Sequence, residues 1–159
     1  IYIIVLKIFF NITYNCTKEY EREDDIMDFS SLVIMETDKN TGMFKGQLGS
    51  YTVGEGASFV KKLKCTDNKV SLYFDTNKDV EEWEYSAIFD FFDKEAFESL
   101  NYVIEEIDDE YNPTWVVYFE FNEEHEKTRD VLNEICNLID EKMKKVFEDI
   151  KGKEKEYTE

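Results

Sequence analysis

The sequence contains little histidine, cysteine and proline. It has a single His, a single Pro and three cysteines, Cys16, Cys65 and Cys136. The cysteines are widely separated and form no CxxC pair, so the pattern predicts free thiols in a reducing compartment rather than a disulfide framework or a zinc site. Neither GxxxxGK[ST] nor GxGxxG occurs, which disfavours a nucleotide-binding loop. We therefore expect no cofactor.

Long hydrophobic runs are also missing. The first ten residues are largely apolar but include Lys7, and this run is too short to span a bilayer. No small-residue cleavage site follows it. The codons for residues 21–23 can form a purine-rich, ribosome-binding string just before Met27. We therefore predict that residues 1–26 are a poorly ordered, non-native translated leader.

Positive charge is scarce, since 19 Lys and Arg face 37 Asp and Glu and the net charge is −18. This charge disfavours direct binding to nucleic acid or to an anionic membrane, because each would repel the protein. Aromatic residues make up 16% of the chain, which is typical of a folded core rather than of an acidic disordered tail. We expect one cytoplasmic domain over residues 27–150, followed by a charged tail over 151–159.

The acidic residues are concentrated in residues 75–112, which contain fourteen Asp and Glu but two Lys and so carry a net charge of −12. Within this stretch Trp83, Ile88 and Phe92 recur at a spacing that suits one face of a helix. The pattern predicts a helix near residues 79–92, with Asn77 or Asp79 as its N-cap.

Two acidic and aromatic segments in this stretch form our candidate binding surface, which we call the acidic belt. Carboxylates would steer a basic protein toward it, and aromatic side chains would anchor that protein. We therefore predict a non-catalytic interaction or regulatory domain that binds a basic partner. The acidic belt consists of Glu81, Glu82, Trp83, Glu84, Tyr85, Asp108, Asp109, Glu110 and Tyr111.

Two alternatives place other functions at the same belt. One is a metal-dependent or carboxylate-based hydrolase, for which Asp75, Asn77 and Asp79 begin like a calcium loop. That loop also needs Gly at its sixth position and Glu at its twelfth, where this sequence has Val80 and Ser86. The other is a mimic of nucleic-acid phosphates that inhibits a DNA- or RNA-binding protein.

The sequence disfavours catalysis, and we assign no catalytic residue. Its one histidine, His125, lies among glutamates, where a solvated side chain is expected. Adjacent acids next to a turn are more typical of a solvated surface than of a buried acid–base pair.

The remaining pattern predicts an α+β fold with an antiparallel sheet of about six strands. The first four strands are expected to form a meander, because short connections separate them, and the last two a hairpin. The apolar segment at residues 114–121 suits an interior strand. The six predicted strands are residues 32–37, 43–53, 59–65, 69–75, 102–107 and 114–121.

A long C-terminal helix is predicted over residues 122–150, with Asn122 as its N-cap. Its apolar residues follow spacings of three and four, so the helix is expected to pack across one face of the sheet. The alternative is a homodimer contact at the end of this helix. That contact would use Met143, Val146, Phe147 and Ile150.

Three segments, LGSYTV, DTNKDVEEWEYSAIFDFF and EYNPTW, resemble those of an uncharacterised bacterial family of unknown function. The resemblance covers Met27 to about Ile150. It implies a cytosolic bacterial domain and brings no activity, cofactor or catalytic residue.

Overall fold

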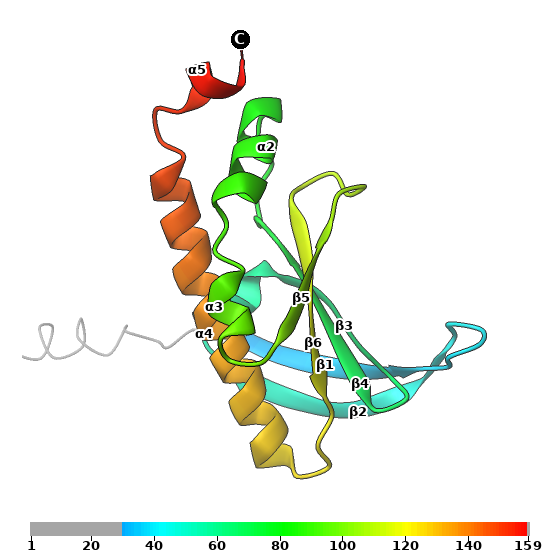
Figure 1. Cartoon of the computed structure of the whole chain (residues 1–159). Helices are drawn as coiled ribbons and strands as arrows, with labels where there is room; N and C mark the ends of the chain where they lie inside the picture. The colour runs from blue at the N-terminus through cyan, green and yellow to red at the C-terminus, as the bar shows by residue number, and fades with distance from the viewer. Residues whose placement is uncertain (1–29, 159) are drawn as a thin grey trace, which may run out of the picture.

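A computed structural model describes residues 30–158, and the predicted leader lies outside these residues. Figure 1 shows one twisted sheet with helices on one side of it. The predicted α+β class, the six strands and the long C-terminal helix are confirmed. The strands are β1 (Ser30–Thr37), β2 (Phe44–Val53), β3 (Val60–Thr66), β4 (Lys69–Asp75), β5 (Val103–Ile107) and β6 (Thr114–Glu120). The helices are η1 (Glu55–Phe59), α2 (Glu82–Phe91), α3 (Glu95–Glu98), α4 (His125–Asp149) and α5 (Glu154–Tyr157).

The strand order is β2-β1-β3-β4-β6-β5, which corrects the predicted meander. β1 lies between β2 and β3 and runs parallel to β3, with Met35 beside Lys64. The chain crosses from β2 to β3 through η1, which buries Gly56 and Ala57. All other pairs are antiparallel, and β6 is interior, as its apolar sequence predicts.

Aromatic rings fill the space between the sheet and α2. Phe74 and Trp115, from adjacent strands, stack with their ring centroids 5.4 Å apart. Phe92 follows α2 and stacks on Trp115 at 4.2 Å, and Phe97 of α3 lies 6.1 Å from Phe74. Each of these rings is at least nine-tenths buried. This packing fixes α2 and α3 against the sheet.

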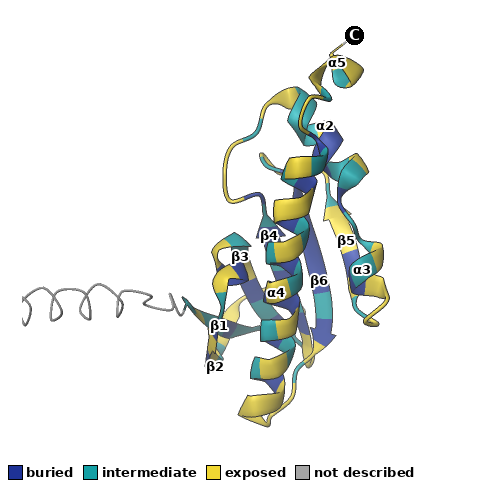
Figure 2. Ribbon diagram, turned by 90° about the vertical axis from the view of Figure 1, so that its left-hand side faces the viewer, coloured by how far each residue is buried: buried dark blue, intermediate teal, exposed yellow. Residues whose placement is uncertain are grey.

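One side of α4 is buried along its length, as Figure 2 shows. Met143, Val146 and Ile150, which we considered for a homodimer, are at most 2% exposed within the chain's own core. Phe147 is half-buried, and the Lys78 ammonium lies 3.8 Å from its ring centroid. Three of the four residues are therefore buried in the core of their own domain, which leaves Phe147 as the partly exposed member of the set.

Both helix starts differ from the prediction. α2 has Glu81 as its N-cap, and α4 has Glu124. Asn122 lies before α4, where its side chain accepts a hydrogen bond from the Glu124 N–H at 2.9 Å. Acidic residues near both starts remain favourable, because the helix dipole stabilises negative charge there.

The segment that we expected to be a charged tail packs back onto α2. The Tyr157 hydroxyl donates to Asp90 Oδ2 at 2.8 Å, and the Lys153 ammonium lies 4.7 Å from the Phe91 ring centroid. α5 is therefore charged and is also part of the folded structure. Within residues 30–158, no helix has the length and apolar character needed to cross a membrane.

Candidate functional site

The acidic belt is formed by the start of α2 and the turn between β5 and β6. These segments are joined by Tyr85, whose hydroxyl donates to the backbone oxygens of Asp108 at 3.1 Å and Glu110 at 3.2 Å. The structure thus brings together the two halves of the predicted surface, which are more than twenty residues apart in sequence.

Two carboxylates of the belt are fixed by the first turn of α2. Glu81 and Glu84 form a capping box, in which Glu84 Oε2 accepts the Glu81 N–H at 2.9 Å. The Trp83 indole N–H donates to Glu81 Oε2 at 2.9 Å. A capping box satisfies backbone donors that the first turn leaves without partners. Glu81 and Glu84 therefore hold the helix start in place as well as contributing charge.

The outer part of the belt is open to solvent. Glu82 and the turn residues Asp108, Asp109 and Glu110 are exposed, and Tyr111 is 79% exposed. Among residues 30–158, none of the six belt carboxylates lies within ion-pair distance of a basic group. The neighbouring Glu106, by contrast, pairs with Lys94 at 2.6 Å. The belt is thus a cluster of uncompensated negative charge.

Burial and the belt carboxylates together raise the pKa of the Tyr85 hydroxyl. Burial is the larger cause, and the negative charges of Asp108, Asp109 and Glu110 add to it. These charges disfavour a phenolate beside them, so the hydroxyl stays protonated and remains a donor to the turn.

The calcium-like segment holds a lysine between two of its candidate ligands. Lys61 Nζ lies 3.3 Å from Asp75 Oδ1 and 2.8 Å from Asn77 Oδ1. Asp75 Oδ1 also accepts the Asn77 N–H at 2.7 Å. The third candidate, Asp79, is exposed. Nowhere in the described part of the chain do three or more His, Cys, Asp or Glu side chains gather as a metal site would need.

The single histidine has neighbours that the sequence did not predict. The His125 ring stacks on Tyr51 with the centroids 4.6 Å apart, and its Nε2 lies 3.0 Å from the Ser50 oxygen. His125 therefore ties the start of α4 to β2. Cys65 is buried, and burial raises the pKa of its thiol. This environment favours the unreactive protonated form of the cysteine.

Sequence reasoning missed the role of Tyr85 as the link between the two halves of the belt. It also missed three lysines, Lys62, Lys64 and Lys69, on the face of the sheet that the helices leave open. The alternation of Lys62 and Lys64 with buried Leu63 and Cys65 was the available signal.

Comparison with known proteins identifies a family. No curated protein matches the chain, and no solved structure does. The sequence pattern of a family of unknown function, DUF6762, matches residues 27–158. This match confirms the resemblance predicted from the three segments, and the chain belongs to this family of unknown function.

Proposed function

We propose that the chain is a non-catalytic interaction domain that binds a basic protein through the acidic belt. The observation that carries this proposal is the joining of six unpaired carboxylates on one surface by the Tyr85 hydroxyl. Unpaired charges of one sign attract an oppositely charged partner and orient it during approach. The buried, free thiols of Cys65 and Cys136 support action in a reducing compartment, and we propose the cytoplasm.

The aromatic members of the belt would supply contact area. Tyr111 projects from the turn beside the acidic residues and is the most exposed of the large apolar side chains in residues 30–158. Lysine and arginine of a partner would place their ammonium or guanidinium groups on the carboxylates. Their methylene stems, or the cations themselves, would lie against the Tyr111 ring. Binding would therefore weaken with salt, because ions screen exposed charges over about 8 Å at physiological ionic strength.

Affinity capture from a bacterial lysate tests the proposal with three immobilised proteins. The first is the native chain. The second is a belt variant in which each Glu becomes Gln and each Asp becomes Asn, which keeps the capping box and removes six charges. The belt substitutions are at Glu81, Glu82, Glu84, Asp108, Asp109 and Glu110.

The third protein is a control variant with the same change in charge on exposed residues away from the belt. We expect the native chain and the control to retain a basic protein that salt releases, and the belt variant to lose it. Equal capture by all three, or capture of no basic protein, would contradict the proposal. The control substitutions are at Glu120, Glu123, Glu126, Asp130, Glu141 and Glu148.

A further inference from the structure

The face of the sheet opposite the helices carries lysine and apolar side chains, although the chain as a whole is strongly acidic. The pairing of the six strands places one row of side chains across this outer face, and at usual strand spacing the row is about 24 Å long. Lysine lies near its middle and apolar residues lie toward both ends. From β2 to β5 the row contains Gln47, Met35, Lys64, Ser71, Tyr118 and Val103.

Three lysines on this outer face, which we call the lysine face, have no acidic partner. Among the described residues, Lys62, Lys64 and Lys69 form no ion pair. The Lys69 ammonium lies 4.1 Å from the Tyr118 ring centroid, and those of Lys62 and Lys64 lie 5.4 and 5.6 Å from the Tyr73 ring centroid. Unpaired lysines are unexpected where acidic residues outnumber basic ones by 37 to 19. Glu120 lies opposite Lys69 in the strand register, and among the described residues the two form no ion pair.

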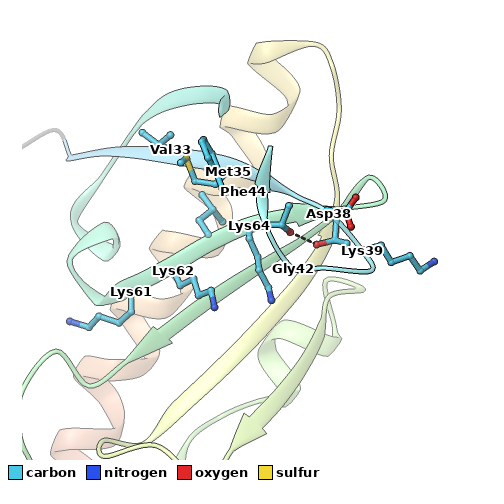
Figure 3. A pocket seen from close by; sticks show the side chains of 12 residues that line it. Val33, Met35, Asp38, Lys39, Gly42, Phe44, Lys61, Lys62 and Lys64 are labelled. Atoms are coloured by element: carbon cyan, nitrogen blue, oxygen red, sulfur yellow. Dashed lines mark hydrogen bonds between the residues drawn. The ribbon is translucent and has the colours of Figure 1, made fainter. Parts of the chain in front are cut away.

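Apolar side chains border the lysine face on both sides. Val33, Met35, Phe44, Lys62 and Lys64 are among the residues that line a hollow of about 690 Å³. Figure 3 shows how these side chains lie around it. Phe44 is 60% exposed, and Met43 next to it is 68% exposed. At the other end of the row, Val103 is 54% exposed. The surface therefore offers cationic groups flanked by uncovered apolar groups.

We infer that this outer face docks an acidic segment of another protein that also carries apolar side chains. Carboxylates of the segment would neutralise the lysine face, and its apolar side chains would cover Met43, Phe44 and Val103. A single-stranded nucleic acid fits less well, because the Tyr73 and Tyr118 rings carry lysine ammonium groups and are not free for bases to stack on. The remaining negative charge would also repel a long phosphate chain.

Fluorescence anisotropy with the full chain tests this inference. The probes are a labelled peptide that alternates Glu with Leu and Ser, the same peptide with Lys in place of Glu, and labelled oligo-dT. One variant carries Lys62→Gln, Lys64→Gln and Lys69→Gln, and a second carries Met43→Ser and Phe44→Ser. The matched control carries Lys127→Gln, Lys145→Gln and Lys151→Gln, which removes three exposed lysines on or next to α4.

We expect the native chain and the control to bind the acidic peptide. The triple variant of the lysine face should bind it roughly tenfold more weakly, since each exposed charge contact contributes modestly. The Met43 and Phe44 variant should also bind it more weakly. Binding of the lysine peptide should be unchanged in the triple variant, because that peptide reports on the belt and shows that the variant is folded.

Three results would overturn the inference. The first is no binding of the acidic peptide, or equal binding by the native chain and the triple variant. The second is oligo-dT binding that the same three substitutions abolish, which would make the outer face a phosphate-binding surface. The third is self-association in sedimentation experiments that these substitutions abolish, which would make it a contact between copies of the chain.

Discussion

Phe74 is the residue on which the aromatic core depends most clearly, because its ring contacts those of Phe92, Phe97 and Trp115. It is fully buried. We expect Phe74→Ala to lower the free energy of unfolding by about 3–5 kcal/mol, since it removes apolar area and leaves a cavity. Urea unfolding followed by circular dichroism measures this loss. Tyr111→Ala is the control and should change stability by less than about 0.5 kcal/mol, because exposed side chains contribute little.

The Tyr85 hydroxyl gives a prediction about the geometry of the belt. Tyr85→Phe removes the hydrogen bonds to Asp108 and Glu110 and should cost about 1 kcal/mol of stability. Amide hydrogen exchange at residues 108–111 should become faster, because the turn loses its link to α2. Tyr118→Phe removes a hydroxyl that donates to Glu105 at 3.1 Å and should leave exchange in this turn unchanged. Unchanged exchange in Tyr85→Phe as well would show that the turn holds its shape without this link.

The buried thiols give a prediction about pH. Burial raises the pKa of Cys136 from 9.0 to about 12 and also raises that of Cys65. In a Cys16→Ser variant, iodoacetamide should therefore label neither thiol of the folded protein at pH 8, and both in urea. Mass spectrometry measures the labelling, and rapid labelling of the folded protein would contradict the burial of both thiols.

The raised pKa of Cys136 makes the stability of the protein depend on pH. The folded pKa of Cys136 is higher than its unfolded value, so the unfolded chain loses this proton first as pH rises. The contribution of Cys136 to stability is therefore complete below pH 9 and is lost as pH rises toward about 12.

At the scale of elements, the approach of η1 to α4 depends on a glycine. A Cβ on Gly56 would lie 1.8 Å from the backbone oxygen of Cys136, so the two elements could not pack as they do. We expect Gly56→Ala to cost about 1–3 kcal/mol, as overpacking in a core does. Gly46→Ala is the matched control, because nothing lies within 4 Å of its added methyl group. Thermal unfolding of both variants measures the difference, and equal melting temperatures would contradict this packing.

The elements show where sequence reasoning succeeded and where it could not. The apolar stripe of α4 and the apolar run of β6 were predictable, because each residue's burial follows from its position in a helix or strand. The parallel pairing of β1 with β3 was not, because alternation shows which face a side chain occupies and not which strand lies beside it. The crossover through η1 allows β3 to lie beside β1. This crossover depends on the close approach of Gly56 to Cys136, and these two residues are 80 positions apart in the sequence.

The candidate site was predictable in part. The charges of the belt are visible in the sequence, and adjacent acids next to a turn were expected to lie on a solvated surface. The sequence did not predict that these turn residues lie next to α2. The contact is made by the Tyr85 hydroxyl, which is more than twenty residues away in the sequence. The Lys61 contacts with Asp75 and Asn77 were equally hidden, since Lys61 comes from a neighbouring strand.

At the scale of the whole molecule, charge is segregated. The acidic belt lies at one end, at the start of α2 and the β5–β6 turn, and the lysine face lies on the uncovered side of β3 and β4. Both surfaces hold charges that the described part of the chain leaves unpaired. A chain of net charge −18 that binds a basic protein at the belt would gain from mutual attraction as the two approach.

Hydrogen exchange of the full chain, with and without the basic protein that it captures, tests the central claim most directly. We predict slower exchange in residues 81–85 and 108–111 when the partner is bound, and loss of this protection in the belt variant. The control variant, with its six substitutions away from the belt, should keep the protection intact. Protection that falls elsewhere on the chain, or that persists in the belt variant, would contradict the assignment of the acidic belt as the binding surface.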